Sequence, residues 1–275
     1  MSILKKKALW FTLYGIFITV AFLYLLFPSD IVRSRLENAV NSSGFILQME
    51  TLRPSLPWGL KMKDITISSA SSVNIPFQGD LLDLQLNPLS FFQKHTYLGL
   101  SGRAYGGKFD GRVGLASLSQ MYPPKEGNLN FQNIDLARYA FIKTLLGREI
   151  TGGAKGNLSY ISAKEISGKG SGTIALFLTK GTYPLAEPFL GLKRIEFDRG
   201  EIKAQLKNGS LKMEKLEISG PQINCFLKGE ITLADDFKLS QLNLTGVMEI
   251  LGTNKAKMNV TIGGTLTNPI FRYIK

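Results

Sequence analysis

From residue 45 onward, apolar and polar residues alternate along most of the chain. The stretch 202–213 shows the pattern clearly: every second residue from Ile202 to Leu206 is apolar, and the alternation resumes at Leu211 after the dipeptide Asn208-Gly209. Asn-Gly accepts the positive φ angles of a type I′ turn, whose twist matches that of the flanking strands. We therefore predict a β-hairpin in this stretch.

The same alternation predicts strands over most of the remaining chain, with turn residues between most of them. The predicted strands are 45–52, 60–68, 80–87, 97–107, 108–115, 127–133, 154–162, 170–178, 194–199, 200–206, 211–219, 222–233, 239–246 and 256–266. A loosely recurring phrase, Gly-x-apolar-x-apolar followed by a turn, indicates a meander of short antiparallel strands. The predicted fold class is mainly β, with a large twisted antiparallel sheet and one or two short helices.

The N-terminal region follows a different pattern. Residues 8–27 contain no charged side chain, and a helix of that length, at ~1.5 Å per residue, spans the ~30 Å hydrocarbon core of a bilayer. We predict an uncleaved transmembrane helix at 8–27, between a cytoplasmic N-terminus at 1–7 and a juxtamembrane helix at 28–44. A cleaved signal peptide is the alternative, but the apolar run is long for one and is followed by no small-x-small cleavage site. Three lysines precede the run, so the positive-inside rule places the bulk of the chain outside the cytoplasm.

The juxtamembrane helix is expected to begin after a cap at Ser29. Its apolar positions Val32, Leu36 and Val40 follow helical spacing, and Gly44 is the expected terminator. We expect this helix to continue the membrane helix into the aqueous phase.

The remaining residues, 45–275, are predicted to form one β domain. A helix near 135–147 divides this domain into two halves, with Asp135 as its cap and Gly147 at the position that ends it. We expect its apolar face to pack on the sheet, although the same face would also suit a contact with another protein.

The formal net charge of +12 is spread over the chain. Lysines and arginines alternate with apolar residues in the strand patterns, which is typical of a solvated sheet face. No nucleic-acid-binding motif is present in the sequence, so no nucleic-acid partner is expected. Attraction to an anionic membrane surface or to an acidic glycan stays open as a second interpretation.

Candidate residues for chemistry are few. His95 is the only histidine and Cys225 the only cysteine, so a zinc site would need several carboxylates, and no spacing suggests one. Cys225 alternates with apolar residues and is expected to be buried, with an intermolecular disulfide as the alternative. The pair Asp235-Asp236 lies at a turn, and the glycine-rich stretch 168–173 continues as a strand where a phosphate loop would need a helix. We predict no catalytic, cofactor-binding or metal-binding residues, and a binding or assembly protein in preference to an enzyme.

The segment 27–67 resembles the type II secretion system protein N family, in its form with an AsmA-like periplasmic region. The features that carry the resemblance are Phe27-Pro28 after the apolar run, a short helix, a strand, and the turn Pro57-Trp58-Gly59-Leu60 that leads into the next strand. The stretches 209–233, 238–246 and 263–274 are also similar to this family.

The resemblance implies a single-pass inner-membrane protein of a Gram-negative bacterium, with its bulk in the periplasm as an AsmA-like open groove or half-barrel. It also implies association with other subunits of the machine that exports folded proteins across the outer membrane, without a cofactor. AsmA-like proteins of lipid traffic share the same features, so lipid binding or lipid transfer in outer-membrane biogenesis is the alternative function. The chain is much shorter than the long lipid-bridging members, which favours the secretion hypothesis.

A sheet with one apolar face must cover that face with a helix, a partner or lipid. We predict an apolar interaction face that includes Leu206, Leu211, Ile223, Cys225 and Leu227. A filled core at this face favours a secretion subunit, whereas an apolar stripe open along successive strands favours binding of lipid acyl chains.

Overall fold

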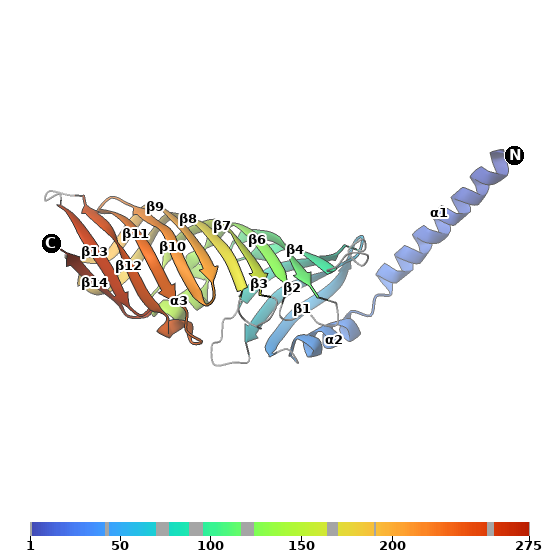
Figure 1. Cartoon of the computed structure of the whole chain (residues 1–275). Helices are drawn as coiled ribbons and strands as arrows, with labels where there is room; N and C mark the ends of the chain where they lie inside the picture. The colour runs from blue at the N-terminus through green and yellow to red at the C-terminus, as the bar shows by residue number, and fades with distance from the viewer. Residues whose placement is uncertain are drawn as a thin grey trace.

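The strands of the protein form one open sheet. The computed structural model describes residues 2–41, 44–69, 77–87, 96–116, 124–163, 170–189, 191–251 and 256–274. Fourteen strands follow one another in chain order, and each pairs antiparallel with the next (Figure 1). This meander confirms the prediction of a mainly β fold with a large antiparallel sheet.

The strands are β1 (Phe45–Ser55), β2 (Gly59–Ser69), β3 (Phe77–Leu86), β4 (Thr96–Ala104), β5 (Gly107–Leu115), β6 (Glu126–Asp135), β7 (Thr151–Ser162), β8 (Gly170–Phe189), β9 (Leu192–Lys207), β10 (Ser210–Ser219), β11 (Ile223–Thr232), β12 (Gln241–Ile250), β13 (Ala256–Gly264) and β14 (Pro269–Ile274). The sheet is twisted, and because its strands follow chain order, β14 and β1 lie at opposite ends of the sheet (Figure 1).

The predicted hairpin at 202–213 is confirmed as the junction of β9 and β10. Asn208 and Gly209 have φ angles of 52° and 78°, as a type I′ turn requires. Leu206 is the register partner of Leu211, so the two apolar positions face the same side of the sheet.

The predicted boundaries around β8 and β9 were wrong. The residues 194–206, predicted as two strands, form the single strand β9, and its partner β8 continues to Phe189 where the prediction ended it at Leu178. The last strand, β14, was not predicted separately, because Pro269 and the turn before it obscured its short alternation.

Two helices precede the sheet. Helix α1 (Ser2–Leu25) projects away from it, and α2 (Ser29–Asn41) lies against β1 (Figure 1). Among residues with described side chains, no single helix has both the length and the hydropathy of a membrane span. Residues Trp10–Leu25 and α2 reach these values only as a pair, across a bend of 66°. Helix α2 therefore follows α1 in the chain, as expected, but turns away from its axis.

Helix α2 is amphipathic and covers the first two strands. Its apolar side chains Val32, Leu36 and Val40 pack against a buried cluster. That cluster consists of Leu47, Met49, Leu52, Met62 and Ile65. The helix begins at Ser29 itself, because the carbonyl of Pro28 accepts the first helical hydrogen bond, from the Val32 amide at 3.1 Å. Ser29 is thus the first helical residue and not the predicted cap.

The interior helix near 135–147 is present but divided. A short 3-10 helix, η2 (Leu136–Arg138), is followed at Tyr139 by α3 (Ala140–Leu146). The Asp135 carboxylate accepts a hydrogen bond from the Ala137 amide at 3.1 Å, and Gly147 ends α3 with a φ angle of 67°. Both predicted boundary residues therefore have the expected roles.

Connections that are far apart in sequence meet next to α3. This helix contacts η3 (Phe237–Leu239), which lies between β11 and β12. The Arg148 guanidinium lies 3.5 Å from the Tyr183 hydroxyl and 3.4 Å from the Thr267 carbonyl oxygen, in the turn between β13 and β14. These contacts tie the middle of the chain to its C-terminal end.

The strands approach one another very closely at some glycines. A Cβ on Gly246 of β12 would overlap the carbonyl oxygen of Phe226 on the neighbouring strand and lie 2.9 Å from the Leu227 Cα. Since both obstacles are backbone atoms of a paired strand, the chain cannot give way without losing ladder hydrogen bonds.

Gly246→Ala is therefore expected to lower the free energy of unfolding by about 1–3 kcal/mol, the usual effect of overpacking. The measurement is urea unfolding of the full chain in detergent micelles, followed by circular dichroism. Gly263→Ala is the matched control, because its Cβ would meet only the Leu242 carbonyl oxygen at 3.8 Å. Equal effects of the two substitutions would contradict the explanation.

Candidate functional site: an apolar strip across the sheet

The register of the strands places apolar residues side by side across the whole sheet. Starting from Leu60 on β2, the partner on every successive strand is apolar or glycine, as far as Phe271 on β14. The members are Pro54, Leu60, Leu84, Leu100, Gly111, Leu129, Leu158, Ile174, Ala204, Met213, Gly229, Leu244, Ile262 and Phe271.

A second row runs beside the first on the same face. Its members are Leu52, Met62, Leu82, Gly102, Phe109, Phe131, Gly156, Leu176, Ile202, Leu216, Leu227, Gly246, Val260 and Tyr273. Side chains on paired strands stand about 4.5–5.5 Å apart, so neighbours within each row are in contact. We call the two rows together the apolar strip.

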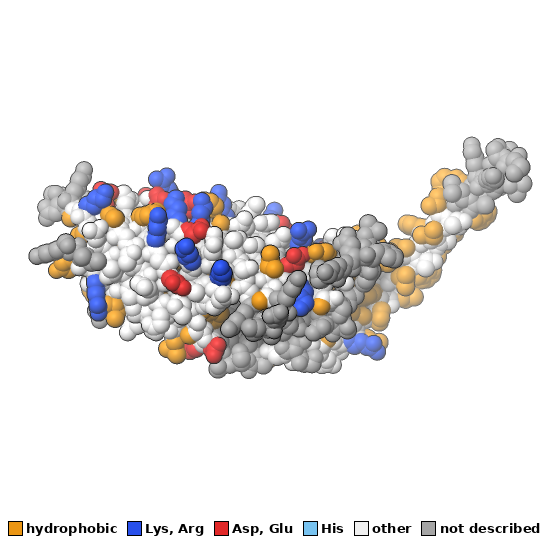
Figure 2. Space-filling model, viewed as in Figure 1, with side chains coloured by type: hydrophobic (Ala, Val, Ile, Leu, Met, Phe, Trp, Pro, Cys, Tyr) orange, Lys and Arg blue, Asp and Glu red, His pale blue; other side chains and the backbone are white. Residues whose placement is uncertain are grey.

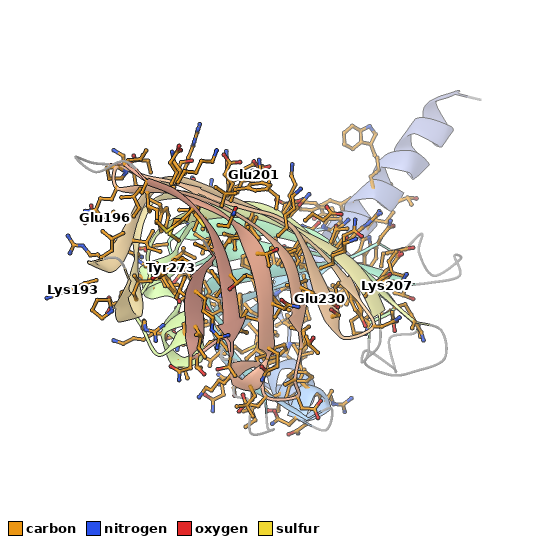
Figure 3. All side chains as sticks on the ribbon, turned by 60° about the vertical axis from the view of Figure 1, so that its left-hand side comes forward. Lys193, Glu196, Glu201, Lys207, Glu230 and Tyr273 are labelled. Carbon is orange, nitrogen blue, oxygen red and sulfur yellow. The ribbon has the colours of Figure 1, made fainter. Side chains whose placement is uncertain are left out.

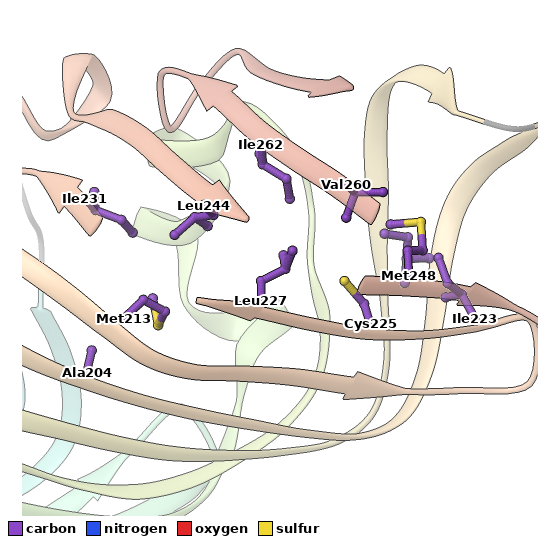
Figure 4. Packing of buried hydrophobic residues seen from close by; sticks show 11 residues of the cluster. Ala204, Met213, Ile223, Cys225, Leu227, Ile231, Leu244, Met248, Val260 and Ile262 are labelled. Atoms are coloured by element: carbon purple, nitrogen blue, oxygen red, sulfur yellow. The ribbon is translucent and has the colours of Figure 1, made fainter. Parts of the chain in front are cut away.

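The strip is covered towards its two ends, although its last member, Tyr273 on β14, is 59% exposed. At the N-terminal end, α2 packs on β1 and β2. At the C-terminal end, the curved strands β9 to β13 enclose a second buried cluster (Figure 4). The far end of the β8–β9 hairpin adds Tyr183, Leu185 and Leu192 to this cluster.

The middle of the strip is less well covered. From β3 to β8, nearly all its side chains, Leu100, Leu129 and Leu158 among them, are half-buried, whereas Phe109 is buried. Residues on the opposite side of the same strands, such as Asn130 and Asn157, are exposed. The apolar face of these strands is thus more protected from water than the polar face, but it is not fully buried.

Three of the five predicted interaction residues lie within the C-terminal cluster. Ile223, Cys225 and Leu227 are only 1%, 8% and 2% exposed. Leu211 is half-buried and packs against the cluster, and Leu206 is half-buried beside it in the hairpin. All five face the same side, as the alternation predicts, but this part of the face is a filled core.

Sequence reasoning did not single out the half-buried middle of the strip. Leu129 and Leu158 show the same alternation as Leu211 and Leu227, so the signal was present in the sequence. What distinguishes them is the covering layer, and local alternation carries no information about that layer.

Burial raises the pKa of the Cys225 thiol to about 11. A buried thiol with a raised pKa is a poor nucleophile, because the thiolate is the reactive species. Cys225 is a free cysteine that packs as an apolar side chain in the core.

The native full chain in detergent micelles is therefore expected to react very slowly with a water-soluble thiol reagent near neutral pH. Full reaction is expected once urea unfolds it. The measurement is a colorimetric thiol assay with and without urea. Rapid labelling of the native protein would contradict the burial of Cys225. A covalent dimer that a reductant dissociates would support the alternative interpretation, an intermolecular disulfide.

The opposite face of the sheet carries charge. Figure 2 shows Lys, Arg, Asp and Glu side chains scattered over the visible surface, and Figure 3 places Glu201 on the outer side of its strand. Glu201 lies 2.8 Å from the Lys203 Nζ and 2.6 Å from the Lys215 Nζ. Hydrogen bonds from Lys203 and then Lys215 lower the pKa of Glu201 from 4.5 to about 2. Because this folded-state pKa is depressed, the stabilisation is present above pH 4.5 and is lost as the pH falls towards 2.

The other candidates for chemistry do not assemble into a site. Asp236 accepts a hydrogen bond from the Lys238 amide at 3.0 Å, so it caps η3, while Asp235 is exposed. His95 and residues 168 and 169 of the glycine-rich stretch lie outside the described residues. Within the described ranges, no three His, Cys, Asp or Glu side chains come together as metal ligands would.

No family model, no curated protein and no solved structure matches this chain. The class that the fold defines is a single open antiparallel sheet with an apolar strip on one face and a projecting N-terminal helix.

Proposed function

We propose that the protein is a non-enzymatic component of the type II secretion system, anchored in the bacterial inner membrane by α1, with its sheet in the periplasm. In this role the sheet binds other subunits and supports the export of folded proteins across the outer membrane. The resemblance of segment 27–67 and of the C-terminal stretches to the protein N family supports the choice of system.

The observation that carries the proposal is the apolar strip. It extends over every strand, and at its C-terminal end it is closed into a filled core around Ile223, Leu227 and Met248. A filled core is what a structural platform needs, since each fully buried side chain of this size contributes about 1.5–3 kcal/mol to folding. The side chains on this face offer shape and apolar area, which support binding and not turnover.

The orientation of the chain is part of the same proposal. In α1, side chains from Trp10 to Leu25 are mostly apolar and exposed, and Figure 2 shows them along the projecting rod. Exposed apolar surface of this extent needs a nonpolar environment. A bilayer supplies it, and the lysines before the helix favour a cytoplasmic N-terminus.

A second candidate function is binding of lipid acyl chains in outer-membrane biogenesis. The half-buried middle of the strip, from β3 to β8, favours it, because a continuous apolar surface that is not fully covered suits a long aliphatic ligand. The two candidates differ in what covers this part of the strip, a protein partner or lipid.

Removal of the protein from its native cell distinguishes the candidates. We expect exported proteins to accumulate in the periplasm while the outer membrane still excludes detergent. The measurement compares proteins in the medium with those in the periplasm, together with growth on detergent. Normal export combined with a detergent-sensitive outer membrane would contradict the secretion role and support the lipid role.

A point substitution tests the lipid role directly. Leu158→Gln places an amide in the middle of the strip, and Asn157→Gln is its matched control on the exposed opposite face. If the strip binds acyl chains, Leu158→Gln weakens binding of a fluorescent fatty acid to the full chain in detergent micelles, while Asn157→Gln binds normally. Circular dichroism checks that both variants are folded. Absence of fatty-acid binding by the unaltered chain would contradict the lipid role.

A further inference from the structure

The turn between β1 and β2 exposes two large apolar side chains. Leu56 is 63% exposed and Trp58 is 64% exposed, and Pro57 lies between them. Scattered exposed apolar residues are ordinary, but an aromatic and an aliphatic side chain at the tip of one tight turn form a small projecting apolar surface. Tryptophan has an apolar body and a polar N–H, which suits the boundary between a bilayer and water.

The turn is held firmly in place. The Trp58 carbonyl oxygen accepts a hydrogen bond from the Leu86 amide at the end of β3, at 2.8 Å. A Cβ on Gly59 would lie 2.6 Å from the Leu84 carbonyl oxygen, so the chain passes against β3 too closely for a side chain there. The two apolar side chains are therefore presented by a fixed backbone, at little further cost in conformational entropy.

The turn also lies at the end of the sheet from which α1 departs. Asn41 accepts a hydrogen bond from the Leu47 amide, and Arg33 donates one to the Glu50 carbonyl oxygen. The eight residue steps from Arg33 to Asn41 span about 12 Å of helix. The three residue steps from Leu47 to Glu50 span about 10 Å of strand.

Helix α2 thus runs antiparallel to β1. The start of α2, next to Phe27, therefore lies near the end of β1, where the β1–β2 turn begins. Figure 1 shows α1 projecting from this end.

Basic side chains stand next to the turn on the outer face. Arg53 and Lys61 are register partners. Lys63 pairs with Thr51, two residues further from the turn along each strand. All three basic side chains are exposed. Like charges on directly paired residues repel one another, and an anionic surface relieves that repulsion. Acidic side chains lie nearby as well: Asp83, the partner of Lys61 on β3, accepts a hydrogen bond from the Ser55 hydroxyl at 2.9 Å, and Glu50, close to Asp64, interacts with Lys63.

We propose that the β1–β2 turn is a second membrane contact: Leu56 and Trp58 enter the interfacial layer of the bilayer that holds α1, and Arg53, Lys61 and Lys63 face its anionic headgroups. This inference rests on the proposed anchoring of α1. One helix alone leaves the sheet free to rotate about the helix axis and to swing at the 66° bend. A second contact fixes the tilt of the sheet, and with it the direction in which the apolar strip leaves the membrane.

The test uses the two tryptophans of the chain as separate reporters. The full chain with Trp10→Phe carries only Trp58 and is reconstituted into vesicles of equal parts phosphatidylcholine and phosphatidylglycerol. Some of the lipids carry bromine near the headgroup end of the acyl chain, which quenches tryptophan only at the interface. We expect lipid quenching of Trp58 and protection from iodide added to the water.

The matched reporter is the Trp58→Phe chain, in which Trp10 reports on α1. Quenching of Trp10 by lipid together with iodide quenching of an unprotected Trp58 would overturn the second contact and leave the anchor intact. If lipid quenches neither tryptophan, the anchoring proposal fails together with this one. Arg53→Gln with Lys61→Gln is expected to reduce lipid quenching of Trp58 in these anionic vesicles, and an unchanged signal would overturn the role of the basic residues.

Discussion

The rest of the structure depends on one constraint, which is that the apolar face of a fourteen-stranded sheet must be kept from water along its whole length. None of the described helices is long enough to cover so many strands. The protein meets the constraint in different ways along the sheet. Helix α2 covers the first strands, and the last strands curl around their own side chains with help from the β8–β9 hairpin. Between them the apolar strip stays half-buried.

This division explains why the ends and the middle of the sheet suit different tasks. The N-terminal end joins the sheet to α1 through Phe27 and α2. Two backbone groups of the edge strand β1 are occupied by α2: the Leu47 amide donates to the Asn41 side chain, and the Glu50 carbonyl accepts from Arg33. Covering an edge in this way limits its pairing with other chains. Strands β9 to β13 enclose a filled core, so the half-buried middle of the strip offers more apolar area to a partner or an acyl chain than this core does.

The proposed functions follow from the same arrangement. Apolar and small side chains occupy the strip, and the charged residues of the opposite face form ion pairs such as that between Glu201 and Lys215. Packed apolar side chains and ion pairs of this kind support a stable surface of fixed shape. The proposed membrane contact at Trp58, together with the proposed anchoring by α1, would give that surface a defined direction, which a subunit of a secretion machine and a lipid carrier both need.

The sequence by itself determined most of the strands, their faces and several turns, because these depend on local alternation and on single residues such as Asn208, Gly209 and Gly147. It missed the unbroken length of β8 and β9 and the separate strand β14. It also indicated that Cys225 belongs to an apolar face. Only the tertiary structure decided that Leu227 is core while Leu158, with the same local pattern, is half-buried, because burial depends on what lies across the sheet. The contact of Arg148 with Thr267 could not be predicted from the sequence either. It joins residues that come close only through the accumulated twist of the strands between them.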